Sequence, residues 1–206
     1  MINEIKLEGT IKEIIGDYAI NNIKYRRYLV SVDRLSGAID ELPVVKRVSA
    51  DTDFKIGDNV SITGELRTRN VKVDETKTRL DIYVQAMTMD HIEEALTLTV
   101  NQCTFEGFIC RQPGLRVTPL NKTVCDLTIA ISNPNGHSYY IPVVCFNSVA
   151  RAADKLAIAD KILLHGRFQS RPYTKTIDNK TVTKVAYEVI GSKLEKITEE
   201  VNNKEV

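Results

Sequence analysis

The sequence predicts an all-β protein with a minor helix, built as two tandem five-stranded barrels. Two observations lead to this fold class. Short alternating apolar runs are separated by turn-forming residues, and the second half of the chain repeats the first half in the same order. The repeat is clearest in the eight residues from Gly64 (GELRTRNV), which correspond to the eight residues from Gly166 (GRFQSRPY). The chain is therefore expected to fold as two similar small units.

Further matches set the boundaries of the two units. The Leu-Pro-Val run at Leu42 and the Ile-Pro-Val run at Ile141 lie 99 residues apart, and Tyr83 and Tyr187, in the last strand of each copy, lie 104 apart. An offset that grows slowly indicates small insertions in loops between matched strands. We expect one domain over residues 1–95, a second over 96–196 and a flexible tail over 197–206.

The second copy shows the elements of one unit most clearly. Stretches rich in turn formers separate five expected strands, at residues 101–111, 124–132, 139–146, 160–171 and 182–191. One helix interrupts the series after the third strand. Asn147 or Ser148 is expected to cap it, and its apolar stripe contains Val149, Ala152, Ala153, Leu156 and Ala157. Five strands with a helix between the third and the fourth are the order of an OB-fold barrel, in which the helix plugs one end. In the first copy, residues 47–56 supply only a short turn.

Composition and motifs exclude several classes of protein. No apolar run reaches the roughly 18 residues of a membrane span, and the N-terminus lacks the apolar core of a signal peptide. We therefore expect a cytoplasmic, nucleoid-associated protein without a membrane partner. The chain has no phosphate-binding loop, dinucleotide fingerprint or nucleophile elbow, its three histidines are scattered, and its four cysteines contain no CxxC pair. Neither catalytic nor metal-binding residues are predicted, no cofactor is expected, and the thiols are interpreted as buried apolar groups.

Charge is unevenly divided between the two halves. Residues 1–95 carry 14 basic and 17 acidic side chains, and residues 96–206 carry 14 basic and 10 acidic ones. The excess of positive charge favours a nucleic-acid surface in the second half.

Two strands of the second half place rings and basic groups on one face. Alternation turns Tyr140 and Phe146 outward on the strand through residues 139–146, opposite a core face. On the strand through residues 162–173 the outward residues are Arg167, Gln169, Arg171 and Tyr173. Rings that stack on bases, beside basic groups that neutralise phosphates, favour the binding of single-stranded nucleic acid. The alternative is that these rings pack beneath loops.

Further basic side chains complete the predicted DNA-binding set. They are Lys175, Arg116 and Arg111 in the second half, and Arg67, Arg69 and Arg27 in the first half.

At these motifs the sequence resembles the bacterial single-stranded DNA-binding protein family. The resemblance rests on the opening strand with Arg116-Val-Thr-Pro119, the run from Ile141 (IPVVCFNSVA) and the GRFQSRPY segment, over about 95 residues of the second copy. The tandem layout is similar to a two-barrel form found in Firmicutes and their mobile elements. The resemblance implies sequence-independent binding of single-stranded DNA in replication, recombination or repair, with base-stacking rings at Tyr140, Phe146 and Tyr173.

The chain departs from the pattern of that family in several places. A further stacking ring expected near Asn135 is missing, and the first copy has Glu41, Arg47 and Val71 where the second has its three rings. The second barrel is therefore expected to carry most of the affinity, and the first to contribute electrostatics and subunit contacts. The family's acidic C-terminal tip is also absent, so replication or repair proteins are possible partners without that usual link. Because family members often assemble four barrels, a homodimer is expected.

Two alternatives remain open from the sequence. One is a protein-interaction module of a primosome or conjugation complex that has kept the fold but has weak affinity for DNA. The other is an RNA-binding OB protein, since stacking and phosphate contacts alone do not distinguish the two kinds of nucleic acid.

Overall fold

The computed structural model describes residues 1–49, 53–93, 100–177 and 180–198. The strands of the first half are β1 (Asn3–Ile20), β2 (Ile23–Asp33), β3 (Ile39–Arg47), β4 (Asn59–Lys72) and β5 (Thr78–His91). Those of the second half are β6 (Asn101–Ile109), β7 (Gly114–Val117), β8 (Thr123–Ser132), β9 (Ser138–Phe146), β10 (Lys161–Ile177) and β11 (Lys180–Lys196). The helix α1 (Asn147–Ala153) lies between β9 and β10. The predicted boundary between residues 95 and 96 and most of the predicted tail lie outside the described residues.

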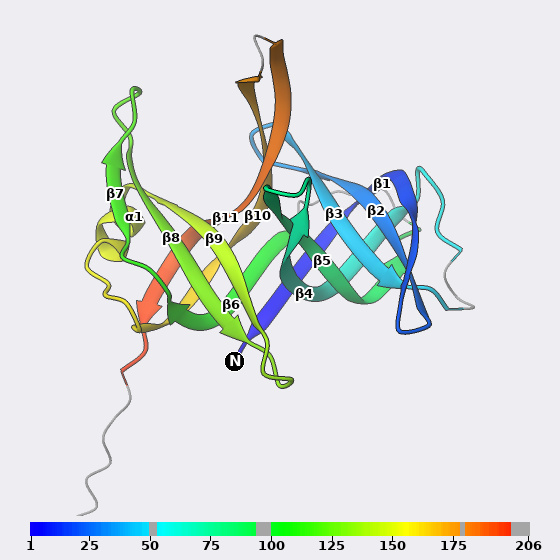
Figure 1. The fold of residues 1–206 in the computed structure, drawn as a ribbon, viewed down its shortest axis with the longest axis horizontal. Helices are drawn as coiled ribbons and strands as arrows, with labels where there is room; N and C mark the ends of the chain where they lie inside the picture. The colour runs from blue at the N-terminus through cyan, green and yellow to red at the C-terminus, as the bar shows by residue number, and fades with distance from the viewer. Residues whose placement is uncertain (50–52, 94–99, 178–179, 199–206) are drawn as a thin grey trace, which may run out of the picture.

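Both halves close into five-stranded barrels, as predicted (Figure 1). In the first half β1 pairs with β2 and β4, β2 pairs with β3, and β5 pairs with β4 and, in parallel, with β3. In the second half β6, β8, β9, β11 and β10 repeat this closed circuit. The short strand β7 adds to the edge of β8 only. No helix among the described residues is long and apolar enough to cross a membrane.

The first strands of the two barrels pair with each other and join the barrels into one continuous sheet. In this antiparallel pairing Asn3 lies opposite Phe105, Ile5 opposite Cys103, and Leu7 opposite Asn101. Equivalent positions of the two copies are 98 residues apart here, so Ile5 faces its own counterpart. The two barrels are therefore related by a local two-fold axis that passes through this pair of residues.

An asparagine at equivalent positions of the two barrels forms hydrogen bonds to the backbone of β4 in the first barrel and of β10 in the second. The side chain of Asn3 donates to the carbonyl of Leu66 and accepts from its N–H, both at 3.0 Å. Asn101 does the same to Phe168, at 2.7 and 2.9 Å. The side-chain amide thus replaces a peptide group in the ladder, so neither backbone group is left without a partner.

Alternation places the barrel cores where the sequence predicts them. Ile141, Val143 and Cys145 of β9 are buried, and so are Ile162, Leu164 and Phe168 of β10. Cys103, Cys125 and Cys145 are free buried thiols, as expected, whereas the free thiol of Cys110 is only partly buried. Burial raises the pKa of Cys125 to about 11 and that of Cys145 to about 12, so both remain protonated near neutral pH.

The helix is shorter than predicted, and its buried face agrees only in part with the predicted stripe. Ala153 and Leu156 are buried and Val149 packs against the core, as predicted, but Ala150 is buried as well, whereas Ala152 and Ala157 are exposed. The cap position is Phe146, which makes no side-chain capping bond, so the prediction of a cap at Asn147 or Ser148 is wrong. In the first barrel the corresponding connection buries Phe54 against the ring of Tyr28. One aromatic side chain thus fills space that a helix covers in the second barrel.

The strands β10 and β11 extend well beyond the ends predicted for them. Their pairing continues from the barrel to Ile177 and Lys180, and the resulting hairpin arm projects from the body of the molecule (Figure 1). Pro172, which ended the predicted strand, is accommodated opposite Val185. Threonines on both strands of the arm favour extended backbone without needing a core beneath them.

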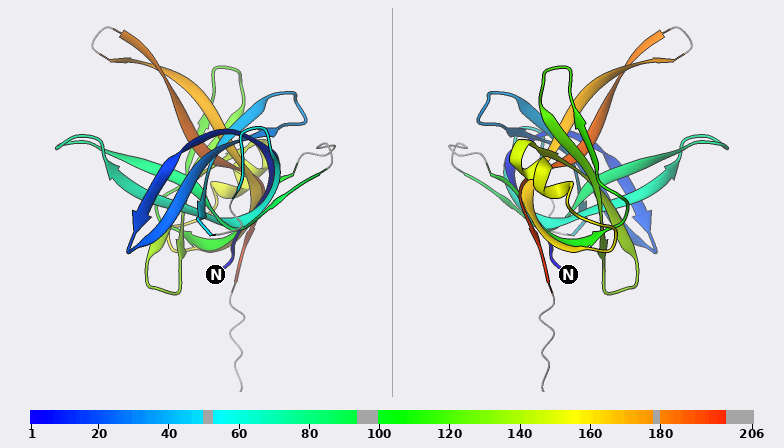
Figure 2. Two further views of the ribbon diagram at one scale, coloured as in Figure 1. Left: turned by 90° about the vertical axis from the view of Figure 1, so that its right-hand side faces the viewer. Right: turned by 90° about the vertical axis from the view of Figure 1, so that its left-hand side faces the viewer.

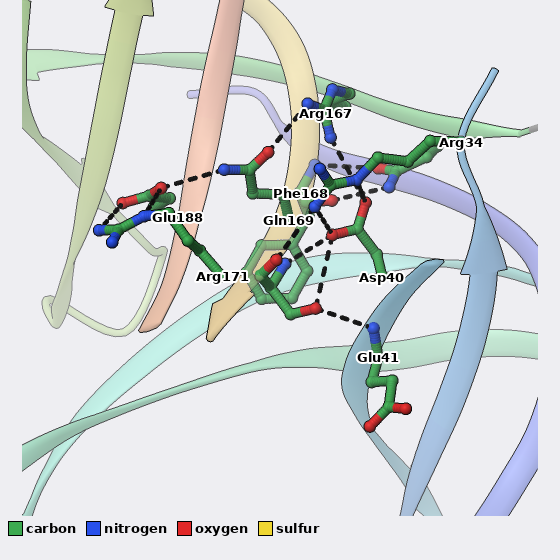
Figure 3. A network of polar contacts seen from close by, with 10 residues as sticks. Arg34, Asp40, Glu41, Arg167, Phe168, Gln169, Arg171 and Glu188 are labelled. Atoms are coloured by element: carbon green, nitrogen blue, oxygen red, sulfur yellow. Dashed lines mark hydrogen bonds and ion pairs between the residues drawn. The ribbon is translucent and has the colours of Figure 1, made fainter. Parts of the chain in front are cut away.

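A buried carboxylate holds the two barrels together away from the β1–β6 seam. Asp40 of β3 is fully buried and accepts hydrogen bonds from Arg34 Nε and from the N–H of Ser170 in β10, both at 2.7 Å (Figure 3). Arg167 of β10 approaches the same carboxylate at 3.4 Å. Ser170 in turn accepts at its hydroxyl from the N–H of Glu41, at 2.9 Å.

The local two-fold axis repeats one of these contacts. On the other side of the seam, the N–H of Tyr140 donates to the hydroxyl of Thr68 at 3.0 Å, in the same way as Glu41 donates to Ser170. The buried carboxylate, by contrast, is found on one side only. At the position that corresponds to Asp40, the second barrel has Tyr139, whose ring lies under Arg67 at 5.7 Å.

We expect the Asp40→Ala substitution to destabilise the protein by about 3–5 kcal/mol, because it leaves Arg34 and Arg167 without their buried carboxylate. Urea unfolding followed by circular dichroism measures this loss. The matched control is Asp33→Ala, which removes an exposed carboxylate near the end of β2. Equal stability of the two variants would contradict a role for Asp40 in joining the barrels.

Candidate nucleic-acid interface

The three predicted stacking rings are exposed on the second barrel. The side chains of Tyr140, Phe146 and Tyr173 are exposed to 52, 36 and 38%. Tyr140 and Phe146 share the outer face of β9, and Tyr173 lies on the hairpin arm opposite Lys184. The alternative that these rings pack beneath loops does not hold.

A surface hollow brings four of the predicted site residues together. Phe146, Arg116, Arg171 and Gln169 line it. The other lining residues are Thr118, Val124, Asp126, Val144 and Glu188. The hollow lies over the outer faces of β7 to β11, with two valines beside the ring of Phe146. Tyr140, Tyr173, Lys175, Arg111 and Arg167 lie outside it.

Both arginines of the hollow are paired with carboxylates, which the sequence analysis did not predict. Arg116 Nε donates to Asp126 at 2.6 Å, and Arg171 Nε donates to Glu188 at 3.0 Å. These hydrogen bonds raise the pKa of both guanidinium groups. Because the arginine side chains are about half exposed, such pairs contribute only about 0–1 kcal/mol each and open readily.

Gln169 lies on the outer face of β10, as predicted, but it is buried there and not exposed. It accepts from Arg167 at 2.8 Å and donates to Glu188 at 3.0 Å. The first barrel covers this part of β10, because β3 packs against it next to Ser170. Gln169 therefore connects Glu188 in the hollow to Arg167 at the contact between the barrels (Figure 3).

Arg167 also differs from the predicted free cation. It belongs to the cluster around Asp40, and burial, followed by the charge of Arg34, lowers the pKa of its guanidinium. Its main role in the structure is to join the two barrels.

The predicted basic residues of the first barrel are likewise paired. Arg27 and Arg69 share Asp81, at 2.7 and 3.1 Å, and Arg67 contacts Glu65 at 2.8 Å. Burial alone raises the pKa of Asp81, but the hydrogen bonds and charges of its two arginines outweigh it and lower that pKa. The carboxyl group therefore stays ionised.

Arg111 and Lys175 are the predicted cations that have no carboxylate partner within the described part of the chain. Arg111 Nε donates to the hydroxyl of Thr128 at 2.7 Å, and Lys175 is exposed on the hairpin arm. In the same described part, no group of three or more His, Cys, Asp or Glu side chains is placed to hold a metal ion.

The register of the last strand corrects one match of the repeat. Val84 pairs with Val44 as Val189 pairs with Val143, so equivalent residues of the last strands are 105 apart. Tyr83 therefore corresponds to Glu188 rather than to Tyr187. The ring of Tyr187 packs against Phe168 on the core side, with centroids 6.0 Å apart. Sequence comparison missed this shift by one residue, and with it Glu188, one of the two acidic residues of the hollow.

Comparison with known proteins agrees with this architecture. Residues 100–197 match the model of the single-strand binding protein family. The wild-type single-stranded DNA binding protein from Thermus aquaticus is similar over 97% of this chain and 94% of that chain, with 20% identity and a TM-score of 0.76. A deletion mutant of the same protein matches over 99% and 98%, with 21% identity and a TM-score of 0.75. No curated protein sequence matches the chain.

These structural likenesses show the fold over nearly the whole chain, including both barrels and their junction. The match to the single-strand binding protein family covers residues 100–197, which include the exposed rings and the hollow.

Proposed function

We propose that the chain binds single-stranded DNA without sequence preference and protects it during replication, recombination or repair. The observation that carries this proposal is the hollow of the family-matched barrel, in which Phe146 lies with Arg116 and Arg171. Tyr140 on β9 and Tyr173 on the hairpin arm are further exposed rings outside the hollow that offer the same kind of contact.

Binding follows from the chemistry of these side chains. Bases stack on Tyr140, Phe146 and Tyr173, at about 1–3 kcal/mol for each ring. Phosphates displace Asp126 and Glu188 from the two arginines of the hollow, since exposed ion pairs are weak. Stacking and phosphate contacts read no base edges, so the binding is independent of sequence.

The experiment that tests the proposal is fluorescence anisotropy with labelled oligo-dT, duplex DNA and RNA at two salt concentrations. We expect the single strand to bind more tightly than the duplex. Equal affinity for the two DNA forms would reject the proposal and favour the protein-interaction alternative. Tighter binding of RNA than of DNA would favour the RNA-binding alternative.

Replacing Tyr140, Phe146 and Tyr173 together with Ala should reduce affinity for oligo-dT at least a hundredfold, because three stacking contacts of about 1–3 kcal/mol are lost. The anisotropy titration measures the loss. A suitable control is Ile56→Ala, which removes an exposed apolar side chain from the first barrel. If both proteins bind like the wild type, the assigned rings do not contact DNA.

The Glu188→Gln substitution should strengthen binding several-fold. It keeps the size of the side chain but frees Arg171 from its carboxylate, which adds a cation for phosphate. The slope of log affinity against log salt should become more negative by about 0.7, the value for one phosphate contact on a single strand. Glu195→Gln is the matched control, because it makes the same charge change on the same strand outside the hollow. Identical behaviour of the two variants would contradict competition between Glu188 and DNA.

We also propose that the protein forms a homodimer with four barrels. Within the chain, the pairing of β1 with β6 already produces half of such an assembly. Sedimentation equilibrium should give twice the chain mass of 23.2 kDa, and a monomer at all concentrations would reject this proposal.

A further inference from the structure

The hollow of the second barrel has a counterpart on the first barrel. The pairing of Gly16 with Arg27 in the first barrel corresponds to that of Gly114 with Asp126 in the second. Likewise, the pairing of Tyr25 with Arg47 corresponds to that of Val124 with Phe146. The equivalent surface of the first barrel can therefore be identified strand by strand.

This counterpart surface has three tyrosines, at positions where the second barrel has no aromatic residue. Tyr18 corresponds to Arg116, Tyr25 to Val124 and Tyr83 to Glu188. The positions equivalent to the second barrel's rings are not aromatic, so the sequence repeat hides these three residues. The aromatic side chains of this surface lie on β1, β2 and β5, and not at the positions of the second barrel's rings.

The tyrosines form one packed group with arginines. The rings of Tyr18 and Tyr25 stack with centroids 5.7 Å apart and planes inclined by 23°. Arg69 lies over Tyr18 at 5.6 Å and over Tyr83 at 5.5 Å, and Arg27 lies over Tyr83 at 5.8 Å. All three rings are half-buried, on the outside of the barrel core. Each ring therefore has part of its surface in contact with solvent.

The balance of charge on this surface also favours contact with phosphate groups. The two acids of the second-barrel hollow, Asp126 and Glu188, are replaced here by Arg27 and Tyr83. Asp81 supplies a carboxylate that Arg27 and Arg69 share. Arg47, at the position of Phe146, is exposed and has no ion pair within the described part of the chain. Cations therefore outnumber carboxylates in this cluster, whereas they are balanced in the second-barrel hollow.

We propose that this tyrosine–arginine surface, formed by Tyr18, Tyr25, Tyr83, Arg27, Arg47 and Arg69, is a second binding site for single-stranded DNA. The inference rests on the proposed function and extends it to the first barrel. Bases stack on the exposed parts of the tyrosines, and phosphates contact Arg47 and Arg69.

The direction of the hairpins allows one strand to reach both sites. In the left view of Figure 2, the β10–β11 arm projects to the upper left, the β4–β5 hairpin to the left and the β1–β2 hairpin to the lower left, so the β4–β5 hairpin lies between the other two. Tyr18 and Tyr25 lie on the first of these, Arg69 on the second and Tyr173 on the third. A strand bound at Tyr173 can therefore continue onto the first barrel.

The test uses the full chain and oligo-dT of two lengths. One length, about 10 nucleotides, fills a single barrel, and the other, about 30 nucleotides, can span both. The variants are Tyr18→Ala/Tyr25→Ala and the conservative Tyr18→Phe/Tyr25→Phe. We expect the Ala variant to lose about tenfold or more in affinity for the long oligonucleotide and to cover fewer nucleotides, while still binding the short one at the second barrel. The Phe variant should behave like the wild type, because stacking needs the ring and not the hydroxyl.

A second variant keeps the test decisive if the Ala variant does not fold. Arg47→Glu changes an exposed side chain and should cause the same selective loss with the long oligonucleotide. Wild-type affinity for the long oligonucleotide in the folded variants would overturn the inference. So would a change in the mass of the free protein without a change in DNA affinity, because the surface would then be a self-contact. If the wild type binds neither length, the proposed function itself fails.

Discussion

The antiparallel pairing of β1 with β6 is the interaction on which the rest of the structure depends. It merges two closed barrels into one sheet and sets a local two-fold axis through Ile5 and Cys103. Asp40, with Arg34 and Arg167, then fixes the first barrel against β10. Because these contacts hold the barrels in one orientation, equivalent surfaces on the two barrels stand in a defined relation. In the binding mode proposed above, a strand therefore meets a preorganised pair of sites rather than two tethered domains.

Carboxylates form ion pairs with most of the basic groups considered on both barrels. Arg116 and Arg171 in the hollow, and Arg27 and Arg69 on the first barrel, each contact an acid in the free protein. In the proposed binding mode, DNA competes with these acids for the guanidinium groups. Such competition would limit the gain from each phosphate contact and leave a larger share of the binding free energy to base stacking. This balance is consistent with a chain whose formal net charge is only +1.

Local pattern was enough to predict the barrels and the exposed rings, because alternation along one strand decides both. Ile141, Val143 and Cys145 face the core for the same reason that Tyr140 and Phe146 face solvent. The pairing of charges could not be predicted, because Arg171 and Glu188 meet only through the register of two strands. The burial of Gln169 depends on the other barrel, which no single strand reveals. A one-residue error in aligning Tyr83 with Tyr187 also concealed that Tyr83 occupies the position of Glu188.

Intrinsic tyrosine fluorescence is the measurement that decides whether bases stack on the exposed rings. The chain has eight tyrosines and no tryptophan, so its fluorescence reports on tyrosine alone. Titration with unlabelled oligo-dT at moderate salt should quench this signal and saturate, while the same concentration of duplex should leave it nearly unchanged. Saturable binding of oligo-dT with no change in tyrosine fluorescence would contradict a stacking interface.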